Sequence, residues 1–195
     1  MEGLNFARES RTPLDTHLII HWGGTLVGDD PDGKLFAKLR YLLDKRFRRK
    51  FAVPLIGIWV RERHRNKHTR QPSEVTHSHL LLHLPSQHRK PVRQDVEELV
   101  ALVAKQILDD RTIELTFPAN PDGKYLLKGG TPAVWEKFRL PHKWRSRLGE
   151  GLIEGKRCGI TQNIGPAARQ RRVTTQKNHG LICPDLDKEF ALKQG

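Results

Sequence analysis

The segment from Thr76 to Leu84 constrains the fold of this chain more than any other, because its side chains alternate in chemistry. Its sequence is THSHLLLHL. Successive side chains of a β-strand point to opposite faces of a sheet. Three imidazoles then share one face and three leucines the other: His77, His79 and His83 against Leu80, Leu82 and Leu84. The pattern predicts a strand that gives its leucines to a core and presents histidines on the opposite face.

Hydrophobic periodicity predicts the other elements. Strands are expected at Leu14–Ile20, continuing to His21 and Trp22, and at Pro54–Arg63, Val75–Leu84, Thr112–Phe117 and Gly159–Ile164. Helices are expected at Lys34–Phe51, Pro91–Asp109, Lys124–Lys128 and Trp135–Arg147, and a long hairpin loop at His64–Glu74. This order predicts an α+β fold, a sandwich in which helices flank a central, mostly antiparallel sheet.

The charge of the chain is large and unevenly placed. The 195 residues carry a formal net charge of +13. Lys34–Arg70 contains 13 Lys and Arg against two acidic residues, and Trp135–Lys177 contains 11 against three. Concentrated positive charge is typical of proteins that bind polyanions, so we expect a nucleic-acid partner.

Other features narrow the class of protein. No apolar run approaches the roughly 20 residues that span a bilayer, so no membrane partner is expected. The first 16 residues lack an apolar stretch of signal-peptide length. The only two cysteines, Cys158 and Cys183, exclude a disulfide-rich secreted scaffold. We therefore expect the protein in the cytoplasm.

Two imidazoles two residues apart on a strand can bind one divalent cation. His77 and His79 are therefore candidate metal ligands, and a neighbouring strand must supply the third. Glu62, at the end of the Pro54–Arg63 strand, would lie near the start of the histidine strand if the two form a hairpin. Glu74 is the competing carboxylate. His83 is expected to play a structural role.

Tyr125 is a candidate nucleophile, because a nearby cation and a metal-polarised phosphate make a phenolic oxygen adequate for attack. Lys128 follows one helical turn later and shares its face. The chain has only two tyrosines, and the other, Tyr41, lies in the basic Lys34–Phe51 helix.

With these parts in this order, residues 14–165 resemble the HUH endonuclease superfamily, in particular single-tyrosine initiators of rolling-circle replication. The resemblance rests on LIIHW (residues 18–22), WVRE (59–62), HSHLLL (77–82), YLLK (125–128) and GKRCGIT (155–161). Two positions depart from the family pattern. Ser78 stands where a bulky apolar residue is usual, and His21-Trp22 where a Thr is common. Residues 166–195 would form a basic, mobile tail.

The resemblance implies a nicking and joining reaction on single-stranded DNA. Glu62, His77 and His79 would hold Mg²⁺ or Mn²⁺, Tyr125 would attack the phosphorus to form a 5′-phosphotyrosine, and Lys128 would offset the developing charge. The implied partner is single-stranded or hairpin DNA at a plasmid or phage replication origin, with a host helicase or polymerase acting beside it. Basic residues expected along the DNA are Lys38, Arg46, Arg49, Arg65, Arg145, Lys156 and Arg157.

Three alternatives stay open from the sequence. The same chemistry serves single-strand transposases and relaxases, although a relaxase usually carries its tyrosine before the histidines. A non-catalytic, basic DNA-binding regulator is a second alternative. A structural zinc protein is the third, with ligands His142, Cys158, His179 and Cys183, whose spacing matches no standard zinc module. The four tryptophans are expected either to stack on unpaired bases or to pack in the core.

Overall fold

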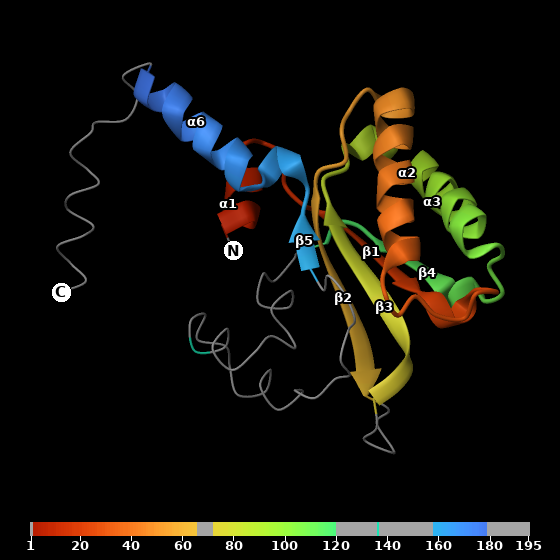
Figure 1. The fold of residues 1–195 in the computed structure, drawn as a ribbon. Helices are drawn as coiled ribbons and strands as arrows, with labels where there is room; N and C mark the ends of the chain where they lie inside the picture. Colours follow the sequence, from red (N-terminus) through yellow and green to blue (C-terminus); the bar gives the residue numbers. More distant parts are fainter. Residues whose placement is uncertain (1, 66–71, 120–135, 137–157, 179–195) are drawn as a thin grey trace.

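The computed structural model of this protein describes residues 2–65, 72–119, 136 and 158–178 (Figure 1). Six elements form a β-α-β-β-α-β unit, the ferredoxin-like order. They are β1 (Thr16–His21), α2 (Lys34–Phe51), β2 (Gly57–Arg65), β3 (Pro72–Leu82), α3 (Arg89–Ala104) and β4 (Ile113–Thr116). Helix α1 (Glu2–Glu9) precedes this unit, and β5 (Cys158–Ile160) and α6 (Pro166–Asn178) follow it.

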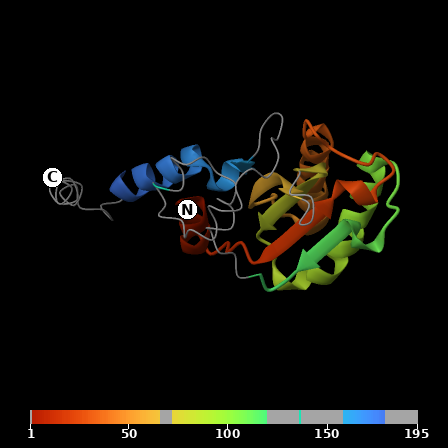
Figure 2. The same cartoon turned by 90° about the horizontal axis from the view of Figure 1, so that it is seen from below.

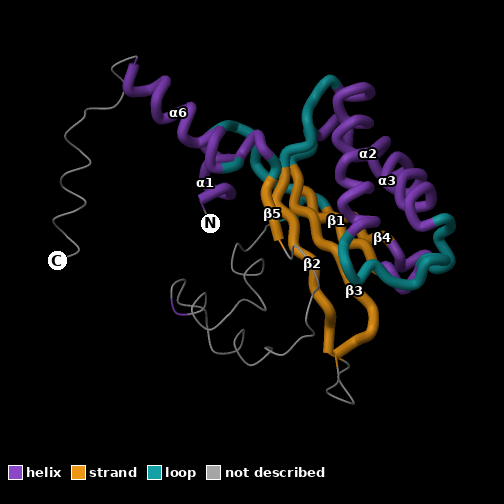
Figure 3. The backbone as a smooth tube through the Cα atoms, in the orientation of Figure 1, coloured by secondary structure: helices purple, strands orange, loops and turns teal. Residues whose placement is uncertain are grey.

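The described strands form one sheet in the order β4-β1-β3-β2-β5, and each neighbouring pair is antiparallel. The histidine strand β3 is central, since it pairs with β1 on one side and with β2 on the other. Helices α2 and α3 lie side by side and cover the same face of the sheet (Figures 1 and 3). The predicted α+β sandwich with an antiparallel sheet is confirmed.

The core lies between the sheet and these two helices. The leucines of β3 face it as the alternation predicts, and the apolar stripe of α2 meets them. Trp59 of β2 packs edge-on against Phe36 of α2, with ring centroids 5.6 Å apart. The centre of this core is formed by ten buried side chains: Leu18, Ile20, Trp22, Phe36, Leu39, Leu43, Phe47, Trp59, Leu80 and Leu82.

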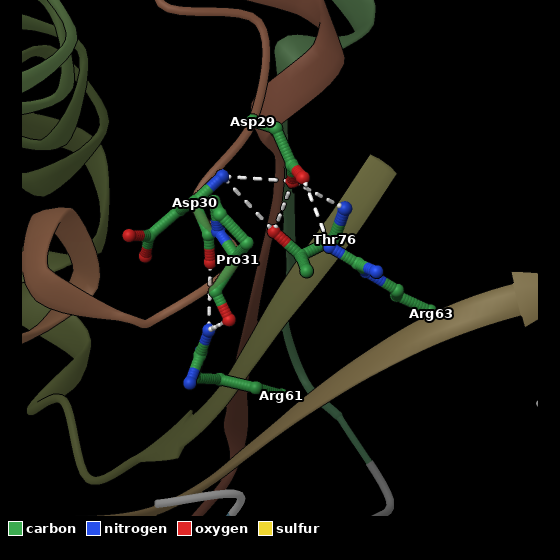
Figure 4. Close-up of polar contacts among 6 residues, drawn as sticks. All are labelled: Asp29, Asp30, Pro31, Arg61, Arg63 and Thr76. Atoms are coloured by element: carbon green, nitrogen blue, oxygen red, sulfur yellow. Dashed lines mark hydrogen bonds and ion pairs between the residues drawn. The ribbon is translucent and has the colours of Figure 1, made fainter. Parts of the chain in front are cut away.

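The loop before α2 is fixed by polar contacts with the β2–β3 hairpin (Figure 4). Asp29 accepts hydrogen bonds from the backbone N–H and the hydroxyl of Thr76, at 2.7 and 2.6 Å. The buried guanidinium of Arg61 donates to the carbonyls of Asp30 and Pro31, at 2.6 and 2.7 Å. These contacts position the first turn of α2 against the sheet.

Asp30 and Gly33 start α2 in place of a conventional side-chain N-cap. The Asp30 carboxylate accepts hydrogen bonds from the N–H groups of Leu35 and Phe36, at 3.0 and 2.9 Å, which satisfies two of the donors at the helix end. Gly33 has a φ of 78°, and a Cβ at this position would lie 2.4 Å from Arg61. The position therefore requires glycine.

Ion pairs tie α2 to α3. The carboxylate of Asp95 on α3 is buried and pairs with Arg46 and with Lys50 of α2, the second at 2.8 Å. Arg46 also lies 3.1 Å from Glu98. A buried carboxylate needs such partners to offset the loss of its hydration.

The opposite face of the sheet is covered only at one end by described residues. There Ala7 of α1, Leu14, Leu81 of β3 and Ile164 form a second, smaller apolar cluster. α1 and α6 lie next to each other at this end (Figure 2). Arg172 of α6 lies 3.5 Å from Glu9 of α1. The remaining part of this face carries the histidines.

The ends of the chain differ from the sequence-based expectation. Helix α1 was not predicted, and residues 166–178, expected to belong to a mobile tail, form α6. A short helix and a polar helix carry little periodic signal of their own. Both gain order through tertiary contacts, in which the guanidinium of Arg172 also lies 5.4 Å from the ring centroid of Phe6. No helix in the described ranges is both long and apolar enough to cross a membrane.

Candidate functional site

The register of the β2–β3 hairpin places the predicted carboxylate beside the predicted imidazoles. Glu62 is directly opposite His77, and His79 is opposite Val60. These side chains share the face of the sheet that α2 and α3 leave uncovered. The Oε1 atom of Glu62 lies 2.9 Å from Nε2 of His79, and both side chains are only 3% exposed. Two residues 17 positions apart in sequence thus form a buried carboxylate–imidazole pair.

His77 lies on the same face but its ring packs against another histidine. His21 of β1 is opposite His77 in the β1–β3 register. The two ring centroids are 4.4 Å apart and the rings are nearly perpendicular. His21 in turn donates from Nε2 to Oε1 of Glu114 on β4, at 2.9 Å. A second carboxylate–imidazole contact therefore continues the polar face toward the β4 edge.

A fourth histidine supports His79 from β1. Nε2 of His17 lies 3.3 Å from Nδ1 of His79, with the rings stacked at a centroid distance of 5.4 Å. Burial, followed by the proximity of His79, lowers the pKa of His17 to about 4. His17 is therefore neutral at pH 7, with one ring nitrogen that donates and one that accepts. Glu62, His79 and His17 form a continuous chain of contacts across three strands.

Sequence reasoning missed the roles of His17, His21 and Glu114. The signal was present in part, since His17 and His21 are separated by an even number of positions on one strand and so share a face. What the sequence did not supply was the pairing of β1 with β3, because those strands are about 60 residues apart in the chain. Without that register, His17 looked like one polar residue in an apolar strand.

The donor set of the site fits Mg²⁺ or Mn²⁺. Carboxylate oxygens bind both ions, and imidazole nitrogens bind divalent transition metals. The Glu62–His79 separation of 2.9 Å is that of a hydrogen bond or ion pair, so a cation bound there would displace the proton between the two atoms. His77 belongs to the same face, with its ring turned to His21. As they stand, no three His, Cys, Asp or Glu side chains within the described ranges converge on one point.

Ser78 lies between the two histidines in sequence but on the other face of the sheet. Its hydroxyl accepts a hydrogen bond from the indole N–H of Trp22, at 2.9 Å. Both side chains are completely buried. Ser78 and Trp22 therefore form one structural feature: the small side chain on β3 lies beside the large indole at the end of β1, and its hydroxyl satisfies the indole donor. Ser78 does not contact the candidate ligands.

The predicted nucleophile and several predicted DNA contacts lie outside the described residues. These are Tyr125, Lys128, Arg145, Lys156 and Arg157, together with the zinc candidates His142, His179 and Cys183. Arg65 ends β2, and Glu74 lies in β3, but their side chains are outside the described part of the structure. Cys158, the remaining zinc candidate, is exposed at the start of β5.

The predicted basic contacts on α2 differ from one another. Lys38 and Arg49 are exposed, whereas Arg46 is committed to Asp95 and Glu98. All three belong to α2, in the helix layer (Figure 1). Glu62 and His79 are on the opposite face of the sheet, since Trp59 and Leu80 of the same strands face the helices. Among the residues that the structure describes, the cationic surface of α2 and the histidine face therefore do not form one continuous track.

Two further side chains singled out from the sequence have structural contacts. His83 follows the end of β3 and donates from Nδ1 to the carbonyl of Pro13, at 2.9 Å. Trp59, like Trp22, is buried in the core, so neither ring is available to stack on a base. Trp135 and Trp144 lie outside the described residues.

Comparison of the chain with family models, with curated proteins and with solved structures found no match. The functional argument therefore depends on the residues and their geometry.

Proposed function

We propose that this protein is a metal-dependent enzyme that nicks and joins single-stranded DNA through a 5′-phosphotyrosine, as an initiator of rolling-circle replication of a plasmid or phage in the cytoplasm. The observation that carries the proposal is the pairing of Glu62 with His79 at 2.9 Å, on a sheet face that also holds His77. This arrangement is the ligand set expected from the family resemblance, and the sequence order places one tyrosine after it.

Glu62, His77 and His79 would hold the metal ion. A bound Mg²⁺ or Mn²⁺ would polarise the scissile phosphate and offset its charge. His79 faces Glu62 through Nε2, so a lone pair is available there only when its proton sits on Nδ1. His17 lies against that Nδ1 and can accept this proton as a hydrogen bond. With a cation at Nε2, His17 would hold His79 in the tautomer that carries its proton on Nδ1, the usual role of a group behind a metal-bound imidazole.

Tyr125 would supply the nucleophile. Its phenolic oxygen, after losing a proton, attacks the phosphorus, and the bond from phosphorus to the 3′ oxygen breaks. That oxygen takes up a proton and becomes a 3′-hydroxyl, while the 5′-phosphate stays on the tyrosine. Lys128 would offset charge at the phosphate. Attack of a 3′-hydroxyl on the same phosphorus reverses the reaction and rejoins a strand, so the phosphodiester energy is conserved.

The two tyrosines allow a matched test of the nucleophile. The full chain is incubated with Mn²⁺ and single-stranded fragments of the DNA that surrounds its gene. We expect an adduct that resists denaturation and maps to Tyr125. Tyr125→Phe should abolish the adduct. Tyr41→Phe removes the same hydroxyl from an exposed position on α2 but keeps the aromatic ring, so it should leave the adduct unchanged.

The outcomes separate the competing functions. Strand binding without cleavage in any fragment would favour a non-catalytic DNA-binding regulator. Cleavage that persists in Tyr125→Phe would contradict the assigned nucleophile. Cleavage at the ends of a mobile element, and not at a replication origin, would favour a single-strand transposase. A host helicase or polymerase would act after the initiator has exposed the 3′-hydroxyl.

A further inference from the structure

Arg40, on α2, has a charge that the described part of the chain does not neutralise. Its guanidinium lies over the core aromatic rings, 4.2 Å from the ring centroid of Trp59 and 5.3 Å from that of Phe36. Its Nε is buried and has no hydrogen-bond partner among the described residues. Burial, and then the proximity of Arg61, lowers the pKa of Arg40. Arg40 is half-buried, and its contacts with the two aromatic rings offset only part of the lost hydration of its charge, so an anion bound here would be favourable.

Arg40 lies where two cavities adjoin. The larger has a volume of about 350 Å³ and is formed by one side of α2 and the segment after β5, with Tyr41, Arg48, Gln162 and Asn163 in its lining. The smaller, about 190 Å³, lies between the first turns of α2 and β2 and is lined by Lys34 and Arg61. Arg40 and Ala37 line both cavities. The cations therefore follow one continuous groove.

The acidic side chains of the groove are already engaged. Asp44 accepts from Nε of Arg48 at 2.8 Å and from the N–H of Leu55 at 2.9 Å. Asp32 pairs with Lys34 at 2.6 Å. In the part of the chain that the structure describes, neither carboxylate pairs with Arg40. Four cations face two anions along the groove. The net charge of the groove is positive.

We infer that this groove binds the phosphate group of a nucleotide, with Arg40 as the main contact. A guanidinium holds a phosphate through two parallel N–H donors, which a lysine does not offer. Tyr41 is 58% exposed and provides a ring on which a base can stack. The amides of Gln162 and Asn163 provide donors and acceptors for a base or sugar. A unit of single-stranded DNA and a free mononucleotide share this chemistry.

The inference does not depend on the proposed nicking activity. The groove is built from the helix layer and the edge of the sheet, whereas Glu62 and His79 face the opposite side. Glu62→Gln should therefore leave binding in the groove unchanged, and loss of binding in the groove should leave metal binding at Glu62 unchanged. Failure of one proposal is distinguishable from failure of the other.

The test uses the full chain and ¹⁵N NMR of the arginine Nε and tryptophan Nε1 groups. Inorganic phosphate, adenosine monophosphate and a short oligothymidylate are titrated separately. We expect saturable shifts of the Arg40 Nε and Trp59 Nε1 signals with at least one nucleotide probe. A shift with the oligonucleotide alone assigns the groove to a DNA strand, and a shift with the mononucleotide assigns it to a free nucleotide.

Two variants of equal charge change give the control. Arg40→Met keeps an unbranched side chain over Trp59, and we expect it to weaken binding about tenfold or more. Lys90→Gln removes an exposed cation of α3 that lines neither cavity, and we expect less than about a twofold change. An Arg40 signal that neither nucleotide probe moves would overturn the inference, even if inorganic phosphate moves it, and this result needs no variant to fold. Equal weakening by both variants would overturn it too.

Discussion

The two faces of the sheet use the same strands for different purposes. Toward α2 and α3 the strands present Leu18, Leu80 and other apolar side chains, and the few polar groups there, such as Ser78, are paired within the core. Toward the other side the same strands present imidazoles and carboxylates that contact one another. Because successive side chains of a strand point to opposite faces, the residues that stabilise the fold and the candidate site residues lie on different faces of the same strands. A change on the helix-facing side should therefore affect stability, and a change on the histidine face should affect metal binding.

The largest expected effect is on stability, from a change in the helix-facing core. Phe47 is buried on α2 and stacks edge-on with Phe51, at a centroid distance of 5.5 Å. Phe47→Ala should lower the free energy of unfolding by about 3–5 kcal/mol, because it removes buried apolar surface and leaves a cavity. Urea unfolding measures the loss. A loss below about 1 kcal/mol would mean that α2 does not pack on the sheet as described.

Ser78→Ala should also affect stability and not metal binding. The change leaves the indole N–H of Trp22 buried without its acceptor, which should cost about 1–3 kcal/mol. Trp22→Phe removes that donor, so the double variant should lose less than the sum of the two single variants. Unfolding of the four proteins in a double-mutant cycle measures this coupling. Additive losses would show that the hydrogen bond between these residues does not contribute.

A change at His17, which contacts Nδ1 of His79, should lower metal affinity and leave stability nearly unchanged. His17→Phe removes the partner of Nδ1, and we expect affinity for Mn²⁺ to fall about 10–100-fold, as for other groups that orient a ligand histidine. His17→Gln can still accept a hydrogen bond and should recover part of the affinity. Calorimetric titration with Mn²⁺ measures both variants. The control is His83→Phe, at a histidine that is hydrogen-bonded to the carbonyl of Pro13. Its affinity for Mn²⁺ should equal that of the unchanged protein.

Equal Mn²⁺ affinity in His17→Phe and the unchanged protein would remove His17 from the site. A large loss of stability in His17→Phe, without loss of affinity in the fraction that stays folded, would assign His17 a structural role. Either result would contradict the assignment of stability to one face of the sheet and metal binding to the other.

The sequence predicted the central unit of the fold well and its ends poorly. Strong periodicity placed α2 at Lys34–Phe51, the range that the structure shows. The alternation in β3 correctly separated leucines from histidines, because strand geometry alone determines that outcome. α1 and α6 were not predicted, since their order depends on contacts such as that of Arg172 with Glu9, between the two ends of the chain.

The sequence predicted where some residues of the candidate site lie, and it missed others. Glu62 could be found because a hairpin brings nearby segments together in a register that the chain itself limits. His17 and Glu114 could not, because their place beside β3 depends on the pairing of strands that are distant in sequence. The cationic surface of α2 was recognised from composition, but composition does not say which side of the sheet a helix covers.

We propose above all that a divalent cation binds at Glu62, His77 and His79. Paramagnetic Mn²⁺ broadens the NMR signals of nuclei near it, and the imidazoles of this chain report its position without any catalytic step. At substoichiometric Mn²⁺ the account predicts that the ring signals of His77 and His79 broaden first, while those of His83 and His88 stay sharp, and that Glu62→Gln suppresses the effect. Broadening that begins at other histidines, or that persists unchanged in Glu62→Gln, would contradict it.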